Sequence, residues 1–354
     1  MTPLEVKVSQ AIAEAGGWLP FDRFMALALY APGLGYYSGS RQKFGLMPQS
    51  GSDFVTAPEL SALFGEALAA QVAQALEATG TDEVWEFGAG TGALASQLLS
   101  HLGERVRRYR IVDLSGSLRQ RQAEKLAPWH SKVEWLDELP AQFSGVVLGN
   151  EVLDAMPVQL LHFDGQQWLE RGVAVEGERL VYADRETETR PPMQAVPGTT
   201  TETHAQAEGF VRTLAAGLER GAVFLIDYGF PEAEYYHPQR IGGTLMCHHL
   251  HRADPDPLSL IGEKDITAHV NFTGIALAGQ DAGLTVLGYT SQANFLINCG
   301  LVERLTHANL AERSMALKLI NEHEMGELFK VIGFSTGEGF DALGFQRGDR
   351  SHTL

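Results

Sequence analysis

Apolar positions near the N-terminus recur at the spacing of helices. Residues 4–15 carry apolar side chains along one face, and a second helical pattern runs to residue 31 after a Gly-Gly break. A third helical pattern covers residues 61–77. The segment before it is rich in Gly, Ser, Tyr and Pro, and its aromatic side chains favour an ordered loop over a linker. We therefore predict that residues 1–78 form helices and a lid loop.

From residue 79 onward the pattern alternates between short apolar runs and helical stretches. This alternation is typical of βαβ units and predicts an α/β fold with a mostly parallel sheet. Strands are expected at 83–87, 109–113, 132–136, 145–149 and 222–229, with helices at 92–102, 115–127, 205–219 and 308–327 and two strands near the C-terminus. Alternating apolar and polar residues at about 159–204 predict exposed β-hairpins and a surface loop inserted into the core, which spans residues 79–354.

The charge of the chain excludes one class of partner and favours another. Its 354 residues are 44% hydrophobic and 20% charged, which is typical of a folded globular protein. The formal net charge of −17 opposes long-range attraction to phosphate backbones, so nucleic acid is not expected as a partner. A cationic substrate would instead be attracted.

The cysteine content and the N-terminal residues indicate a cytoplasmic protein. Only Cys247 and Cys299 occur, without a CxxC pair, so neither a disulfide framework nor a thiolate metal site is expected. The first residues contain no basic segment followed by an apolar one. No apolar run approaches the ~18 residues that cross a bilayer, and we expect no membrane segment.

The stretch EFGAGTGAL, which begins at Glu86, follows the first predicted core strand and opens a helix. With Gly88, Gly90 and Ala93 it fits the turn that binds a dinucleotide pyrophosphate. With Glu86, Gly88, Gly90 and Gly92 it fits the ExGxGxG turn around the amino-acid end of S-adenosylmethionine. A tight turn without a ligand is the third interpretation.

Glu86 distinguishes the two cofactors. A buried carboxylate would repel a pyrophosphate, whereas S-adenosylmethionine presents an ammonium and a sulfonium. A paired structural acid is the alternative for Glu86. Asp113 ends the second core strand, where a carboxylate accepts both hydroxyls of a ribose, and both cofactors predict it. We therefore expect a methyl donor, held by Glu86, Gly88, Ala89, Gly90, Gly92, Asp113 and Leu114.

The stretch GNEVLDAMPV lies at the carboxyl end of the fourth predicted core strand, where open α/β sheets bind ligands. If a helical turn follows Asn150, Glu151 and Asp154 stand at i and i+3 on one face. Two carboxylates beside a sulfonium methyl would orient a cationic nitrogen nucleophile and help to remove its proton. Asn150 would fix the pocket edge and contact the donor. A solvated acidic helix cap is the alternative.

With these stretches in hand, the sequence resembles the MidA-like class I methyltransferases, bacterial relatives of a mitochondrial protein arginine methyltransferase that assists assembly of respiratory complex I. EFGAGTG alone indicates only a class I methyltransferase, whereas NEVLDAMPV and DFVTAPE are more specific. The stretches that carry the resemblance are GYYS, GSDFVTAPELSALFGE, EFGAGTG, GNEVLDAMPV, LIDYGF, DITAHVNFTGI, QANFLINCGL and FKVIGF, in this order from residue 35 to residue 334.

The resemblance implies a seven-stranded Rossmann-like core with an N-terminal helical segment and insertions, and methylation of arginine on a protein. The chain departs from the family pattern HVDF, because Asn271 stands where the family has an aspartate. His269 precedes it and is a candidate for the substrate pocket, with a satisfied core histidine as the alternative.

The remaining candidate residues surround the expected reaction centre. Tyr228 would wall the methyl-transfer channel or simply pack in the core. Tyr37, Thr56 and Pro58 belong to segments that we expect to fold over the cofactor and exclude water. The histidines of HHLH, residues 248–251, lack a flanking acid or cysteine at ligand spacing, and surface histidines are the simpler interpretation.

Three other functions compete with protein arginine methylation. A methyltransferase of a small basic metabolite would share every cofactor residue and differ at the pocket mouth. An assembly chaperone without catalysis would keep the fold and the donor. A dinucleotide oxidoreductase is disfavoured by Glu86. The expected partner is thus a protein with an exposed arginine, and the sequence leaves open whether the chain forms a homodimer.

Overall fold

The computed structural model describes residues 1–39, 55–113, 116–250 and 252–354. Two predictions concern residues outside these ranges. They are Leu114, which was assigned to the cofactor site, and the first four residues of GSDFVTAPEL. Across the described residues, no helix is both long enough and apolar enough to pass through a membrane.

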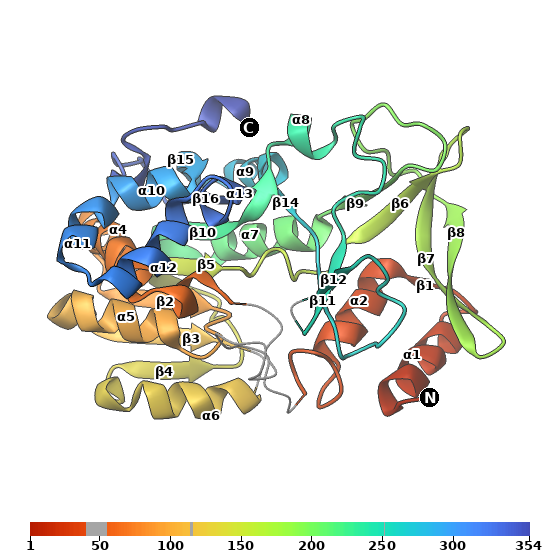
Figure 1. Cartoon of the computed structure of the whole chain (residues 1–354), viewed down its shortest axis with the longest axis horizontal. Coiled ribbons are helices and arrows are strands. Elements are labelled where there is room, and N and C mark those ends of the chain that lie inside the picture. The colour runs from red at the N-terminus through yellow and green to blue at the C-terminus, as the bar shows by residue number, and fades with distance from the viewer. Residues whose placement is uncertain (40–54, 114–115, 251) are drawn as a thin grey trace.

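The predicted seven-stranded core sheet is confirmed (Figure 1). Its strands run in the order β15-β16-β10-β5-β2-β3-β4, and a short eighth strand, β14, pairs with β10. The pairs from β10 to β4 are parallel, whereas β16 is antiparallel to both neighbours. The strands are β2 (Glu83–Phe87), β3 (Arg108–Val112), β4 (Val133–Leu136), β5 (Phe143–Asn150), β10 (Leu218–Phe230), β14 (Val270–Asn271), β15 (Thr285–Ser291) and β16 (Phe329–Ser335).

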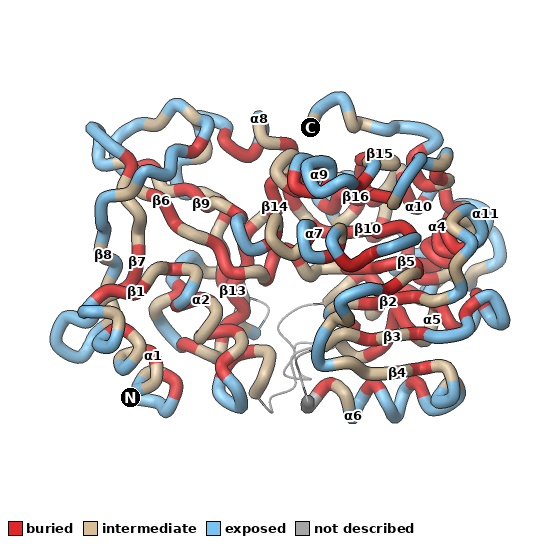
Figure 2. The backbone as a smooth tube through the Cα atoms, turned by 180° about the vertical axis from the view of Figure 1, so that it is seen from behind, coloured by how far each residue is buried: buried red, intermediate tan, exposed pale blue. Residues whose placement is uncertain are grey.

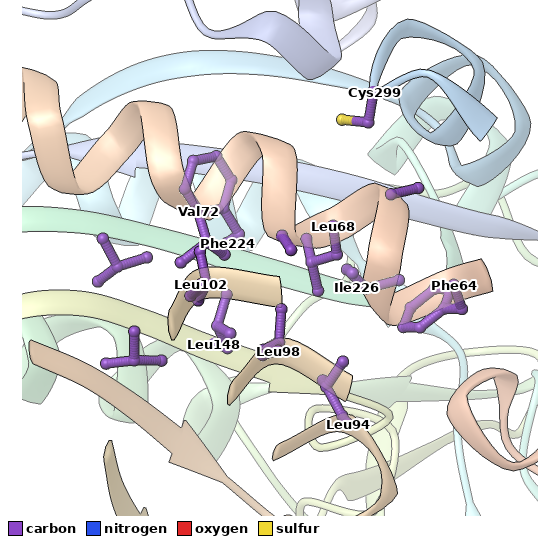
Figure 3. Packing of buried hydrophobic residues seen from close by; sticks show 14 of the residues in the cluster. Phe64, Leu68, Val72, Leu94, Leu98, Leu102, Leu148, Phe224, Ile226 and Cys299 are labelled. Atoms are coloured by element: carbon purple, nitrogen blue, oxygen red, sulfur yellow. The ribbon is translucent and has the colours of Figure 1, made fainter. Parts of the chain in front are cut away.

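Helices cover both faces of this sheet. On one face α4 (Ala62–Thr79) and α5 (Ala93–Leu102) pack their apolar sides on β5 and β10, and Figure 3 shows Leu68 and Leu98 among the buried side chains there. A left-handed Gly80 ends α4. The other helices of the core are α6 (Gly116–Lys125), α7 (Ala205–Gly217), α9 (Phe272–Asp281), α10 (Gln292–Asn298) and α11 (Leu301–His307).

The long helix predicted at 308–327 is interrupted. The structure has α12 (Leu310–Ile320) and α13 (Met325–Leu328), joined by a turn in which Gly326 donates to the carbonyl of Asn321. A capping box begins α12, because Asn309 and Glu312 exchange side-chain and backbone hydrogen bonds. Most of the apolar side chains of α12 are exposed in the structure.

The inserted hairpins form a second sheet together with the N-terminal residues. Its strands are β1 (Leu19–Pro20), β6 (Gln159–Phe163), β7 (Trp168–Glu176), β8 (Arg179–Glu186) and β9 (Thr200–Thr203). We expected these hairpins to be exposed, but helices α1 (Pro3–Glu14) and α2 (Phe21–Tyr30) cover one face, and Phe24, Leu160 and Val173 share one core. Helices α1 and α2 and this second sheet form the N-terminal lobe, and the buried stretches of this lobe and of the core lobe are visible in Figure 2.

Short elements connect the two lobes. A three-stranded sheet of β11 (Met246–His249), β12 (Arg252–Asp254) and β13 (Asp265–Thr267) lies beside α2, and its Ile266 belongs to the N-terminal core. Helix α3 (Ala57–Leu60) precedes α4, and α8 (Glu232–Tyr235) follows β10. In Figure 1, helices α1 and α2 lie on the opposite side of the molecule from β2 and α5.

Candidate active site

A cavity of about 610 Å³ lies at the carboxyl ends of β2, β3 and β5. The strand order reverses between β3 and β5 on either side of β2, and ligands of open α/β sheets bind at such a switch point. Further lining residues come from α2, α3 and α7, among them Tyr30, Pro58 and Phe210. The cavity thus joins the core to the N-terminal lobe.

The glycine turn forms the floor of the cavity. Gly88, Gly90 and Gly92 all have positive φ values, 63°, 52° and 79°. A Cβ atom on Gly88 would lie 3.0 Å from Val152, so the segments that follow β2 and β5 are in close contact. Gly88, Ala89 and Gly90 line the cavity, whereas Gly92 is the N-cap of α5 and packs on α6. The turn is therefore shaped for close approach of a ligand.

Glu86 is buried, with 3% of its surface exposed, and lines the cavity. The hydroxyl of Tyr109 donates to its carboxylate at 2.6 Å. Burial raises the pKa of Glu86 to about 7, against the effect of that hydrogen bond, and nearby Asp113 raises it further. A cationic ligand group would stabilise the charged form of this carboxylate.

Asp113 follows β3 and lines the same cavity. The side-chain amide of Gln122, on α6, donates to its Oδ2 atom at 2.9 Å. Sequence patterns gave no reason to select Gln122, because nothing in them shows that α6 turns this residue towards the glycine turn. The two acids expected to hold the donor thus stand in one cavity.

Glu151 occupies an unusual backbone conformation directly after β5. Its φ is 55°, in the left-handed region that non-glycine residues seldom adopt. Its Oε1 atom accepts hydrogen bonds from the amide of Asn150 at 2.9 Å and from the backbone nitrogen of Ala57 at 3.4 Å. Burial, and then the charge of Asp154, raise the pKa of Glu151 to about 8.

The helical turn that we expected after Asn150 is absent, since residues 151–156 form bends and turns. The left-handed Glu151 prevents a helix from starting there. Glu151 lines the cavity, but Asp154 does not, and its Oδ2 atom accepts a hydrogen bond from the hydroxyl of Tyr228. Burial raises the pKa of Asp154 to about 6. The two carboxyls are neighbours but do not share a helix face.

Asp227 holds the loop that carries Glu151 and Asp154. Its Oδ2 atom accepts hydrogen bonds from the backbone nitrogens of Val152, Leu153 and Asp154 at 3.1, 2.9 and 3.2 Å. Its other oxygen accepts from the backbone nitrogen of Tyr228 at 2.9 Å. Asp227 is fully buried, and the sequence patterns gave no reason to assign it a role.

Two tyrosines of the N-terminal lobe form part of the cavity wall. Tyr30 and Tyr37 lie nearly parallel, with ring centroids 5.5 Å apart. The hydroxyl of Tyr30 donates to the carbonyl of Ala155 at 2.8 Å, and that of Tyr37 donates to Asp265 at 2.9 Å. Tyr37, Thr56 and Pro58 all line the cavity.

Tyr228 and His269 lie outside the cavity lining. Their rings meet edge to face with centroids 5.0 Å apart. Burial, together with the positive charges of Arg240 and Lys330, lowers the pKa of His269 to about 4. Asn271 is the N-cap of α9, where its side chain accepts from the backbone nitrogen of Gly274 at 3.3 Å. Asparagine and aspartate are equally good at this position, so capping survives the departure from the family pattern.

The cavity is acidic. Four carboxylic side chains line it, namely Glu59, Glu86, Asp113 and Glu151, and within the described ranges no lysine, arginine or histidine does. Asn150 adds a buried Oδ1 atom that has no hydrogen-bond partner among the residues described. These oxygens fit a ligand that brings positive charge and N–H donors.

This sheet order, with its glycine turn and acidic cavity at the switch point, defines a class I methyltransferase. The sequence matches the family described as "Putative S-adenosyl-L-methionine-dependent methyltransferase" over residues 67–290, and the chain belongs to this family. The predicted fold and the MidA-like resemblance are therefore confirmed.

Relatives with solved structures support the cofactor. A Burkholderia thailandensis protein in complex with S-adenosyl-homocysteine is 53% identical, with a TM-score of 0.96 over 99% of this chain and 96% of its own. A second structure from that organism is 51% identical, with a TM-score of 0.91 over the same shares. The cofactor is S-adenosyl-L-methionine, as Glu86 predicted, and S-adenosyl-homocysteine is its demethylated product.

More distant relatives carry a more specific name. The protein arginine methyltransferase NDUFAF7 of Danio rerio is 27% identical, and the alignment covers 90% of this chain and 83% of that protein. The Homo sapiens protein of the same name is 26% identical, with 94% and 84% covered. Both are described as mitochondrial.

Proposed function

We propose that this methyltransferase modifies a guanidinium nitrogen of arginine on a protein substrate. The observation that carries the proposal is the acidic cavity, in which Glu151 stands at the strand end beside the glycine turn and no basic side chain is found among the described lining residues. A cationic acceptor would be drawn into such a cavity, and a second positive charge beside the donor would be compensated by these acids. The names of the distant relatives support the same acceptor.

The donor end of the site would be held by three groups. Glu86 would accept hydrogen bonds from an ammonium, Asp113 would accept those of ribose hydroxyls, and the backbone at Gly88 and Gly90 would let the ligand approach closely. S-adenosylmethionine supplies an electrophilic methyl group on a sulfonium. The buried Oδ1 atom of Asn150 is a further acceptor at the edge between donor and acceptor.

Glu151 would orient the guanidinium and take its proton. A planar guanidinium presents N–H groups that match a carboxylate, so the ionised Glu151 would hold one nitrogen in line with the methyl group. Loss of the proton from that nitrogen makes its lone pair available, and the raised pKa of Glu151 makes this carboxylate a stronger base than an exposed one. Asp154 would act less directly, through its charge on Glu151 and its bond to Tyr228.

Transfer of label from S-adenosylmethionine to peptides tests the proposal. Two peptides that differ only in one arginine or lysine would be compared with free arginine. We expect label on the arginine peptide, and a loss of ~10² or more in rate for Glu151→Gln, the usual scale for a positioned base. Exposed Glu77, on α4, provides the matched control Glu77→Gln, which should retain the parental rate.

The outcome distinguishes the competing functions. Label on free arginine but not on the peptide would assign a small basic metabolite as acceptor. Binding of the donor without transfer to any cationic acceptor would favour the assembly chaperone. Label on lysine alone would contradict the proposal, because an ammonium cannot bridge a carboxylate as a guanidinium does.

A further inference from the structure

A buried glutamine connects the two halves of the donor site. Gln122 on α6 has no exposed surface. Its Nε2 atom donates at 2.9 Å to the carbonyl of Gly90, in the glycine turn, and at 2.9 Å to Asp113, after the second strand. One amide group therefore contacts both elements that are expected to hold the donor, the turn at its methionine end and the acid at its ribose.

The orientation of this amide is fixed by its third partner. The indole nitrogen of Trp135, on β4, donates to the Oε1 atom of Gln122 at 2.9 Å. An indole N–H can only donate, whereas a carbonyl and a carboxylate can only accept. The amide oxygen must therefore face Trp135, and both N–H groups must face Gly90 and Asp113. The opposite orientation would leave all three contacts mismatched.

Helix α6 also packs directly on the glycine turn. A Cβ atom on Gly92 would lie 3.5 Å from the Cα and Cγ atoms of Gln122. The ammonium of Lys125, one turn further along, donates to the hydroxyl of Thr91 at 3.3 Å. The backbone of Gln122 is thus held against the turn, so its side chain has little freedom to follow a displaced Asp113.

We propose that Gln122 is a positioning residue of the donor site, which sets the distance between the Gly90 backbone and the Asp113 carboxylate so that both ends of S-adenosylmethionine are held at once. The amide does not need to touch the donor. Without it, Asp113 would lose a buried N–H donor and could turn away from the ribose, and the cost of restoring its position would appear in donor affinity. This inference goes beyond the proposed function, because it holds for any methyl acceptor.

Three variants separate positioning from packing. Gln122→Met keeps the length of the side chain and removes all three hydrogen bonds. Gln122→Glu keeps the shape but places an acceptor against two acceptors when ionised, whereas its protonated form can again donate to Asp113. Gln120→Met, on the exposed face of the same helix, is the matched control, since Gln120 bonds only Glu124 at 3.3 Å among the contacts described.

Calorimetry with S-adenosyl-homocysteine at pH 8.5 and pH 5.5 measures the effect, with the fold checked by circular dichroism. We expect Gln122→Met to raise the Kd about 10- to 100-fold at both pH values, the scale of a lost hydrogen bond to a charged group. Gln122→Glu should raise it as much at pH 8.5 and clearly less at pH 5.5, each relative to the parental protein at the same pH. Gln120→Met should bind as the parental protein does.

Two results would overturn the proposal. One is parental affinity in folded Gln122→Met. The other is an equal loss for Gln122→Glu at both pH values, which would mean that a donor restored towards Asp113 does not restore donor affinity. If neither variant folds, Trp135→Phe remains, because it keeps an aromatic side chain while removing the indole N–H that orients the amide. We expect a smaller rise in Kd, about 3- to 10-fold, and an unchanged Kd in that variant would equally contradict the role of Gln122.

Discussion

The carboxylate of Asp227 lies 2.9 Å from the backbone nitrogen of Leu153, in the loop that begins with the left-handed Glu151. The same oxygen accepts from the residues on either side of Leu153, so one buried acid fixes three consecutive peptide groups. A further bond joins the nitrogen of Glu151 to the carbonyl of Ile226. Strand β10 therefore holds Glu151 in a conformation that the residue would not adopt by itself.

Replacement of Asp227 tests whether this loop positions Glu151, the carboxylate that we propose as the base. Asp227→Asn keeps the size but turns one acceptor oxygen into an N–H donor that faces other donors. We expect a loss of about 1–3 kcal/mol in unfolding free energy, with methyl transfer reduced at saturating donor and donor affinity nearly unchanged. Denaturant titration measures the unfolding free energy, transfer of label measures turnover, and calorimetry measures donor affinity. A variant with parental turnover would show that Glu151 keeps its place without Asp227.

We predict that the carboxyl group of Glu86 releases a proton when the donor binds. Its pKa of about 7 results first from burial, so roughly half of the molecules carry a proton there at neutral pH. The ammonium of S-adenosyl-homocysteine would favour the carboxylate and expel that proton. The heat of binding at pH 7 should therefore depend on the ionisation enthalpy of the buffer, and Glu86→Gln should remove the dependence. Equal heats in phosphate and Tris would place the ammonium elsewhere.

Asp113 is expected to anchor the ribose. Asp113→Ala should weaken donor binding by ~1 to 3 kcal/mol, because hydrogen bonds to a charged acceptor contribute about that much. Asp137 provides a matched control, since it follows β4 as Asp113 follows β3 but is exposed and paired with Arg119. Calorimetry measures the donor affinity of both variants, and only Asp113→Ala should bind more weakly than the parental protein. If Asp137→Ala and Asp113→Ala bind alike, the ribose is held by another group.

The raised pKa of Glu151 also affects stability. A pKa of about 8 in the folded state, above the ordinary 4.5, means that the folded protein binds more protons than the unfolded one between these values. Stability from this group is therefore lost as pH rises from 4.5 to 8. Glu151→Gln escapes that loss, so its melting temperature relative to the parental protein should increase between pH 5 and pH 8.5. A constant difference would mean that Glu151 is ionised throughout.

Much of the core could be predicted from the sequence because its strands are short, apolar and regularly separated. The strand predicted at 83–87 is β2, and the helix predicted at 92–102 begins one residue later as α5. The packing of helices α1 and α2 over the inserted hairpins could not be predicted. Residues such as Phe24 and Leu160 are far apart in the chain, and a local pattern does not show that they pack together.

Some residues of the candidate site could likewise be predicted from the sequence, and others could not. Gly88, Gly90 and Glu86 were identifiable because a ligand turn needs particular residue types at fixed spacing. Gln122 and Asp227 were not, because each acts through backbone groups or a neighbouring acid brought close only by the fold. The helical turn expected after Asn150 failed for a related reason, since a tertiary contact to β10 determines the φ of Glu151.

Mass spectrometry of cellular proteins tests the central claim most directly. Cells that lack this protein would be compared with cells that carry the parental gene or Glu151→Gln, and peptides would be searched for methylated arginine. The account predicts at least one arginine that is methylated only with the parental protein, while purified Glu151→Gln still binds S-adenosyl-homocysteine with near-parental affinity. Arginine methylation that is the same in all three, or fully retained with Glu151→Gln, would contradict it.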